Sequence, residues 1–273
     1  SSAGYDLTRL FVGSEGTLGI FTELTIRLFP IPEAIAGGVC RFPSVQASCD
    51  AAIMAIQMGI PLARVELVDA QQIKICNAYS KLDLQEQPTL FVEFHGSEMG
   101  VKEQSERFAD IVAEFGGSPF EWSTKAEDRT RLWKARHDMF WADKAYRPGS
   151  QVVVTDVCVP ISRLAECVTE THADIERSRL IAPLFGHVGD GNFHTVVSVM
   201  MDDADEVARA KAFVGRLAER ALAMEGTCTG EHGIGDGKQK YLAAELDAPA
   251  VEAMRSIKRA LDPSGIMNPG KIF

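Results

Sequence analysis

Hydrophobic positions along this chain follow two spacings. In some segments apolar residues recur every three to four positions, as on one face of a helix, and in others they alternate with polar residues, as on a half-buried strand. Strands are predicted over residues 62–68, 89–95, 151–158, 181–187 and 192–200. Helices are predicted from Ser44 to about 58 and over residues 69–80, 99–115, 125–144, 160–178, 203–224, 236–245 and 248–261. This alternation predicts an α+β fold, an antiparallel sheet covered on one side by helices.

The first thirty residues differ from the rest of the chain. A glycine-rich stretch over 10–20 is followed by Leu24, Ile26 and Leu28, which alternate with polar residues as in a half-buried strand. A single strand is not stable without partners. We therefore expect residues 1–33 to be the end of a domain whose larger part lies upstream, and residues 34–273 to form a second domain.

The last predicted helix has clear signals at both ends. Asp247 can cap its first turn, which contains Pro249, and Asp262 followed by Pro263 ends it. The chain beyond this helix is short and rich in turn residues, so taken by itself it predicts an irregular end.

Composition excludes some classes of function. With 46% hydrophobic residues among 273, the chain can bury a substantial core. Its formal net charge of −10 argues against a nucleic-acid-binding surface, which needs clustered Lys and Arg. No apolar run approaches the roughly 20 residues of a membrane span. The six cysteines form no Cys-x-x-Cys pair, which indicates reduced thiols of an intracellular-type compartment.

The stretch from His187 to His194 is the first candidate for chemistry. Its Asp190-Gly191 dipeptide is typical of a two-residue hairpin turn, which would place His187 opposite His194 on adjacent strands. Their Cβ atoms would then lie roughly 5 Å apart on one face. Two imidazole nitrogens that bind one ion at about 2.1 Å each fit that separation. The same residues are also compatible with two packed histidines beside an ordinary turn.

A second glycine-rich stretch contains the other residues that such a site would need. Glu231 could supply a carboxylate as the third ligand and leave one coordination position open, as catalytic metal sites do. The adjacent His232 could then transfer a proton.

Arg136 is a candidate for binding a substrate carboxylate. Trp133, Arg136 and Phe140 fall at i, i+3 and i+7 of a predicted helix, which places a guanidinium on an aromatic face. The planar guanidinium donors fit the two oxygens of a carboxylate. The alternative is that Arg136 reaches the surface or pairs with a structural carboxylate.

Four blocks of the sequence occur in a fixed order along the chain. They are Leu10-Phe-Val-Gly-Ser-Glu-Gly-Thr-Leu-Gly-Ile20, Gly186-His-Val-Gly-Asp-Gly-Asn-Phe-His194, Gly226-Thr-Cys-Thr-Gly-Glu-His-Gly-Ile-Gly235 and Asp262-Pro-Ser-Gly-Ile-Met-Asn-Pro-Gly-Lys271. They resemble the FAD-linked oxidases and dehydrogenases of the vanillyl-alcohol-oxidase and p-cresol-methylhydroxylase type. Within that family the resemblance is greatest to the branch that contains D-lactate dehydrogenase (cytochrome), the glycolate oxidase flavoprotein subunit and D-2-hydroxyglutarate dehydrogenase.

The resemblance implies a role for each candidate residue. Residues 1–33 would be the C-terminal end of an FAD-binding domain, and residues 34–273 a substrate and cap domain. His187, His194 and Glu231 would ligate a divalent metal, namely zinc, manganese or iron. His232 would be the catalytic base, and Arg136 would hold the substrate carboxylate. Flavin contacts are implied for Gly13, Ser14, Gly16, Thr17 and Asn268.

The implied reaction is FAD-dependent oxidation of a D-2-hydroxy acid to the 2-oxo acid, with electrons passed on to a cytochrome or a quinone. D-lactate is favoured over a dicarboxylate such as D-2-hydroxyglutarate because the predicted strand 151–158 carries no Lys or Arg. Glycolate is a further alternative substrate. Without the upstream part of the FAD-binding domain, this chain is expected to be inactive by itself.

Further expectations concern location and assembly. The protein would act in the bacterial cytoplasm, including the inner-membrane surface, or in the mitochondrion of a eukaryote, and a homodimer is compatible with it. Two functions of other classes fit the same histidines and glutamate. A metallohydrolase would use the metal to activate water, and a non-catalytic metal-binding domain would keep the ion in a closed site.

Overall fold

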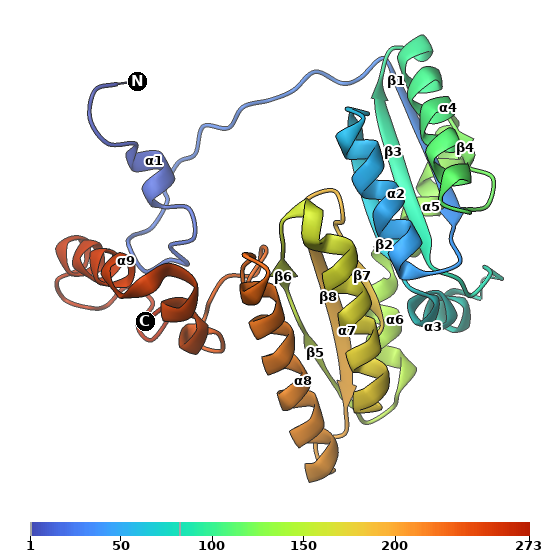
Figure 1. Cartoon of the computed structure of the whole chain (residues 1–273). Helices are drawn as coiled ribbons and strands as arrows, with labels where there is room; N and C mark the ends of the chain where they lie inside the picture. The colour runs from blue at the N-terminus through green and yellow to red at the C-terminus, as the bar shows by residue number, and fades with distance from the viewer. Residues whose placement is uncertain (1, 82) are drawn as a thin grey trace. The chain divides into compact units, whose positions relative to one another are not determined.

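The computed structural model describes residues 2–81 and 83–273 and divides the chain into two compact units. The larger, here called the sheet unit, is Ile31–Gly226. The smaller, here called the loop-and-tail unit, joins the chain up to Pro30 with Thr227–Phe273. Residues 227–273, predicted to belong with 34–226, thus group with the N-terminal stretch. Helices and strands of both units are labelled in Figure 1.

The sheet unit is built on one antiparallel sheet. Its strand order is β4-β1-β3-β2-β7-β8-β5, and β6 pairs with β8. The strands are β1 (Ala34–Arg41), β2 (Leu62–Val68), β3 (Thr89–Gly96), β4 (Glu121–Ser123), β5 (Gln151–Val154), β6 (Val157–Cys158), β7 (Leu184–Gly186) and β8 (Asn192–Val199). The predicted α+β class and the antiparallel sheet are confirmed.

Helices cover both faces of this sheet, not one as predicted. They are α2 (Val45–Gln57), α3 (Ala70–Ser80), α4 (Glu98–Glu114), α5 (Ala126–His137), α6 (Met139–Tyr146), α7 (Leu164–Ser178) and α8 (Ala204–Ala223). In β3, Leu90, Val92 and Phe94 pack into a core with α2, α4, α7 and α8, whereas Phe91 packs into a second core with α3, α5 and α6. Strand β8 is accordingly buried at all its positions.

Most helices begin where the sequence places a capping side chain. Ser44 accepts a hydrogen bond from the amide of Ala47 at 3.1 Å, and Asp69 accepts one from the amide of Gln72 at 2.7 Å. Such caps satisfy amides that have no partner within the helix. Several sequence-predicted boundaries were wrong: the helix over 125–144 breaks at Asp138, the strand over 151–158 is split into β5 and β6, and a 3-10 turn precedes α7.

Strands β1 and β4 were not predicted. Strand β1 contains two consecutive glycines and shows no clear alternation, and β4 has only three residues. The contact between the two strands explains why residue 38 is a glycine. A Cβ atom at this position would lie 2.5 Å from the carbonyl oxygen of Glu121 and 2.7 Å from the Cβ of Trp122. The close approach of β4 to β1 therefore requires glycine.

The loop-and-tail unit contains α1 (Leu7–Leu10) and α9 (Gln239–Leu261). Asp247 interrupts α9 with φ 62°, and its carboxylate accepts a hydrogen bond from the amide of Ala250 at 2.9 Å, which confirms the predicted cap. None of the described helices is long and apolar enough to cross a membrane.

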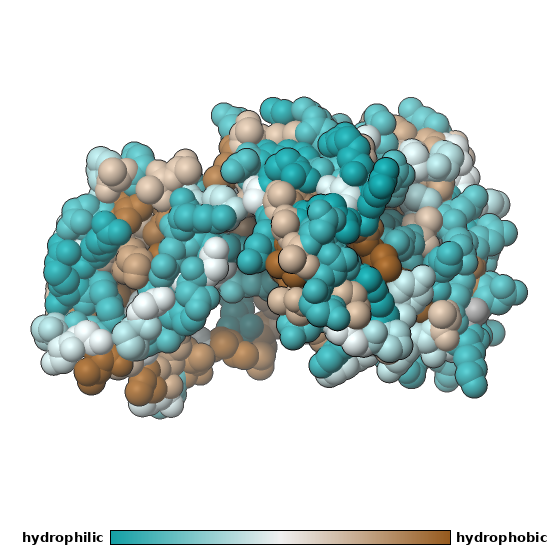
Figure 2. Space-filling view, turned by 90° about the horizontal axis from the view of Figure 1, so that it is seen from below, coloured by the Kyte–Doolittle hydropathy of each residue, from teal (hydrophilic) through white to brown (hydrophobic). Residues whose placement is uncertain are grey.

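The predicted strand near the N-terminus does not form in this structure. Residues 23–32 have no strand conformation, and Leu24, Ile26 and Leu28 are 71%, 71% and 81% exposed. The physical reason is that none of the strands in the described part of the chain pairs with this segment to satisfy its backbone groups. Most of the surface in Figure 2 is hydrophilic, with brown apolar residues interrupting it in patches.

A buried carboxyl group joins α6 to α3. Asp143 is 3% exposed, and its Oδ1 accepts a hydrogen bond from Gln72 Nε2 at 2.8 Å. Burial raises the pKa of Asp143 to about 7, despite that hydrogen bond. Asp143 Oδ2 and Gln72 Oε1 are buried and have no hydrogen-bond partner in the described part of the chain. A protonated Asp143 would remove this mismatch, since its hydroxyl could donate to the amide oxygen.

The contribution of Asp143 to stability is therefore expected to fall as pH rises from about 4 to about 7. The folded state keeps the Asp143 proton in this range while the unfolded state, with a pKa of about 3.9, loses it, which costs about 1.4 kcal/mol per pH unit. Denaturant unfolding of wild type and Asp143→Asn at a series of pH values measures this. The variant should lack this component and be the more stable protein above pH 7. Parallel pH profiles of the two proteins would show that Asp143 is ionised.

Candidate functional site

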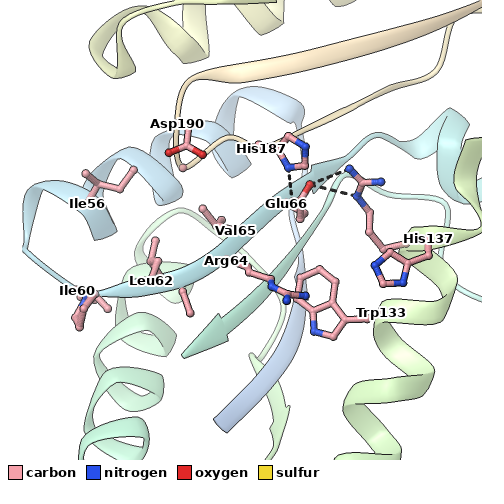
Figure 3. Close-up of a pocket in the computed structure, with 14 residues that line it drawn as sticks. Ile56, Ile60, Leu62, Arg64, Val65, Glu66, Trp133, His137, His187 and Asp190 are labelled. Atoms are coloured by element: carbon pink, nitrogen blue, oxygen red, sulfur yellow. Dashed lines mark hydrogen bonds and ion pairs between the residues drawn. The ribbon is translucent and has the colours of Figure 1, made fainter. Parts of the chain in front are cut away.

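A cleft of about 710 Å³ lies in the sheet unit, between β2, the end of α2, helix α5 and the turn after β7 (Figure 3). Its charged and titratable lining residues are Arg64, Glu66, Arg136, His137, His187 and Asp190. Two of these, Arg136 and His187, are candidates from the sequence. The cleft thus brings together residues that are far apart in the chain.

Glu66 is the centre of this group, although the sequence analysis did not single it out. It lies in β2 and is 8% exposed. One carboxylate oxygen is 2.5 Å from His187 Nδ1, and the other accepts hydrogen bonds from Arg136 Nε at 3.2 Å and Nη2 at 3.0 Å. Burial raises the pKa of Glu66, but the hydrogen bond from His187 and the charge of Arg136 outweigh it and hold that pKa below its usual value. Glu66 is therefore a carboxylate at neutral pH.

Arg136 is fixed by this carboxylate and by an aromatic ring. Its guanidinium carbon lies 4.7 Å from the ring centroid of Phe185. Its side chain is 14% exposed, so the ion pair with Glu66 is largely shielded from water. The alternative considered from the sequence, pairing with a carboxylate of the protein, is what the structure shows. The predicted aromatic face is only partly present: Trp133 is buried, but Phe140 lies beyond the break at Asp138 and is 39% exposed.

The hairpin that carries the two histidines has a different register from the predicted one. His194 lies opposite Phe185, not His187, so residues 187–191 form a longer connection between β7 and β8. A two-residue type I′ turn needs positive φ at both central residues, and here Gly191 has φ 80° while Asp190 does not have positive φ. Because the shift is by two residues, His187 and His194 keep the same face. Their ring centroids are 5.6 Å apart.

Both imidazoles are held through the same ring nitrogen. His187 Nδ1 contacts the carboxylate of Glu66, while His194 Nδ1 lies 3.2 Å from the carbonyl oxygen of Thr155 and 3.6 Å from Asp156 Oδ1. Acceptors at Nδ1 favour the tautomer with the proton there, so that Nε2 carries the lone pair. Metal-binding histidines are commonly oriented in this way, through a carboxylate or carbonyl on the non-ligating nitrogen. The pair therefore fits a divalent ion.

Glu231 and His232 belong to the loop-and-tail unit. Their side chains are half exposed, and His232 Nε2 lies 3.5 Å from Glu231 Oε1. The following residues are held by Glu15, whose carboxylate accepts hydrogen bonds from the amides of Ile234 at 2.6 Å and Gly235 at 2.9 Å. Glu15 thus fixes the loop on which the candidate ligand and base lie.

The candidate flavin contacts are brought together in the same unit. Residues 13–17 form a tight loop in which Thr17 is buried and Ser14 is 8% exposed. Asn268 Nδ2 donates to the carbonyl oxygen of Glu15. Lys258 Nζ donates to the carbonyl oxygens of Thr17 at 2.7 Å and Met267 at 2.8 Å. The C-terminal tail, which by itself predicts an irregular end, is therefore tied to the glycine-rich loop.

A family model described as "FAD linked oxidases, C-terminal domain" matches residues 31–272. The chain belongs to this family. It is 50% identical to "Probable D-lactate dehydrogenase, mitochondrial" of Danio rerio, over 100% of this chain and 55% of that protein. It is 45% identical to "D-lactate dehydrogenase [cytochrome], mitochondrial" of Arabidopsis thaliana, over 100% of this chain and 48% of that protein. The chain spans about half the length of these relatives.

More distant relatives extend the family. Identity to "Glycolate oxidase subunit GlcD" of Bacillus subtilis (strain 168) is 32%, over 99% of this chain and 58% of that protein. Among solved structures, 4-ethylphenol oxidase from Gulosibacter chungangensis matches with a TM-score of 0.69 at 15% identity, over 90% of this chain and 55% of that one. p-Cresol methylhydroxylase matches with a TM-score of 0.64 at 16% identity, over 90% and 54%. The family model confirms the family that the four sequence blocks indicate, and the solved structures confirm the fold.

This FAD-linked oxidase domain has a second buried carboxylate beside the cleft. Glu93 of β3 accepts a hydrogen bond from Trp133 Nε1 at 2.7 Å and lies 2.7 Å from His95 Nε2. Arg64 lies over the Trp133 ring, 5.1 Å from its centroid, and lines the cleft. The sequence analysis looked for a second cation only in strand 151–158. Arg64 was missed because it reaches the cleft from β2.

Proposed function

We propose that the whole protein oxidises a D-2-hydroxy acid, with D-lactate as the main substrate, to the 2-oxo acid in an FAD-dependent reaction. The curated relatives of highest identity quoted above are D-lactate dehydrogenases. The observation that carries the proposal is the cleft in which Arg136, Glu66 and an oriented His187 meet. A small carboxylate with a hydroxyl on the next carbon needs a guanidinium and an electrophilic or basic group side by side.

In this proposal His187, His194 and Glu231 hold a divalent metal, which is zinc, manganese or iron(II), since imidazole and carboxylate ligands suit all three. The Nδ1 contacts of both histidines support it, because they direct Nε2 toward a ligand role. Flavin, when bound, accepts the C2 hydride, and a divalent metal, when bound, stabilises negative charge on the hydroxyl oxygen.

The remaining roles fall to side chains of this chain. Arg136 binds and orients the substrate carboxylate, and His232 accepts the hydroxyl proton as general base. The loop containing Gly13, Ser14, Gly16 and Thr17 borders the flavin together with Asn268. Residues 1–33 are proposed as the end of the FAD-binding domain, and residues 34–273 as the substrate and cap domain.

The electrons would then pass to a cytochrome or a quinone. A cytochrome is supported by the names of the relatives from Arabidopsis thaliana and Saccharomyces cerevisiae, which also place those proteins in mitochondria. A mitochondrial location in a eukaryote, or a cytoplasmic one in a bacterium, is proposed on the same basis. The second candidate activity is glycolate oxidation, supported by similarity to glycolate oxidase subunits.

The test is reduction of bound flavin without oxygen. Addition of D-lactate to the whole protein, reconstituted with FAD, is expected to bleach the flavin absorbance, and L-lactate is expected not to. Glycolate and D-2-hydroxyglutarate, tested in parallel, rank the alternative substrates. A protein that binds no flavin, or whose flavin none of these acids reduces, would contradict the proposal and favour a hydrolase or a non-catalytic metal-binding domain.

A further inference from the structure

One buried carboxylate connects two groups of the proposed site. Glu66 Oε1 contacts His187 Nδ1, and Glu66 Oε2 accepts two hydrogen bonds from Arg136. Figure 3 shows Glu66 and His187, two residues that line the cleft, pointing toward each other. Glu66 lies 121 residues from His187 and 70 from Arg136 in sequence. The two groups are thus held by one side chain that no sequence motif includes.

We propose that Glu66 is a positioning residue that sets His187 for metal binding and Arg136 for substrate carboxylate binding at the same time. This rests on the proposed function, since it concerns the same metal and substrate. Glu66 itself touches neither: both its oxygens are occupied by the two side chains that it orients.

The contact with Glu66 sets the tautomer of His187. A carboxylate can only accept hydrogen bonds, so His187 must donate to it from Nδ1. Neutral His187 then has its lone pair at Nε2, the nitrogen that is proposed to bind the metal. A neutral amide at position 66 could present its NH₂ group instead, which would favour the other tautomer and place the proton on Nε2. The negative charge at Glu66 excludes that arrangement.

Glu66 also fixes the geometry of Arg136. Glu66 takes Nε and Nη2 of the guanidinium, and the Phe185 ring lies against its face. Two of the five N–H donors are used in this way, and the group's rotation is blocked. A guanidinium fixed before the substrate arrives loses less conformational entropy on binding it. His187 and Arg136 are therefore both ordered in the folded protein before metal or substrate binds.

The neighbouring strand offers a matched control. Glu93 is also buried, at 6% exposure against 8% for Glu66, and its two carboxylate oxygens each lie 2.7 Å from a ring nitrogen, of His95 and of Trp133. Its carboxylate contacts Trp133, His95 and Arg64. A change at Glu93 therefore removes the same charge at the same depth in the sheet without touching His187 or Arg136.

The experiment compares Glu66→Gln, Glu66→Asp and Glu93→Gln in the FAD-loaded whole protein. The affinity for Mn²⁺ is measured by competition with a chelating dye, and flavin reduction by D-lactate gives the Michaelis constant. Glu66→Gln is expected to bind Mn²⁺ about 10–100-fold more weakly than wild type, the loss typical of a removed partner of a metal ligand. It should also raise KM for D-lactate. Glu93→Gln should bind Mn²⁺ within about two-fold of wild type.

The outcomes separate the two proposals. Equal Mn²⁺ affinity of Glu66→Gln and Glu93→Gln would overturn the role of Glu66 while leaving the proposed metal site intact. A wild type that binds no Mn²⁺, Zn²⁺ or Fe²⁺ would contradict the proposed function, and the role of Glu66 with it. Glu66→Asp keeps the charge but shortens the reach, so it should lie between wild type and Glu66→Gln. It also provides the measurement if Glu66→Gln does not fold, as judged by thermal unfolding.

Discussion

Replacement of His187 by alanine is expected to remove the bound metal from the holoenzyme while FAD remains bound. His187 is proposed as one of three ligands, and its ring is held by Glu66. Loss of a ligand should weaken binding by more than the 10–100-fold typical for loss of a ligand's partner. Elemental analysis after dialysis should find close to one metal per chain in wild type and almost none in the variant.

His137→Ala is the control for this prediction. His137 also lines the cleft, but it has no proposed ligand role. Its removal should leave the metal content unchanged. A full equivalent of metal in His187→Ala would show that the hairpin histidines are not the site, and they would then be two histidines packed beside a turn.

His232→Ala is expected to lower turnover with D-lactate by roughly 10²–10⁴-fold, the usual contribution of a positioned general base. Metal and flavin content should stay close to wild type, because His232 is not proposed to hold either group. The measurement is the rate of flavin reduction at saturating D-lactate, together with metal and flavin analysis of the same sample. A base that has been deleted can be replaced by added imidazole, so partial rescue of the rate by imidazole is expected.

The matched control is His172→Ala. His172 lies on α7, is 39% exposed and is 3.7 Å from Glu176, and it should have no effect on the rate. If His232→Ala keeps its rate to within a few-fold, another group accepts the proton. A large loss of rate accompanied by loss of metal would instead assign His232 to metal binding.

Most of the secondary structure could be predicted from the sequence because it depends on local pattern. The strands over residues 62–68 and 89–95 and the helix starts at Ser44 and Asp247 depend on signals within a few residues, and the structure confirms all of them. The failures have local reasons too. Strand β1 has no alternation to detect, and the isolated apolar alternation of residues 24–28 forms no strand, because a strand needs a partner.

The candidate site could be predicted only where its residues are close in sequence. The predicted register of the hairpin was wrong by two residues. His187 and His194 still lie on one face, because side chains in a strand alternate with a period of two. The glycine-rich blocks also indicated the correct family.

Glu66 had no such signal. In the sequence it is the one acidic residue of a strand that also contains Arg64, and nothing nearby in the chain identifies its partners.

The sequence by itself therefore determined the α+β class and the family, and it proposed most of the candidate site residues, because motif and periodicity are properties of neighbouring residues. Only the tertiary structure decided that helices bury both faces of the sheet, and that Glu66 binds His187 and Arg136 above Phe185. Those contacts join residues 70 and 121 positions apart. They are set by which strands pair and how the helices pack, and a buried charge is retained there because its partners compensate for the loss of water.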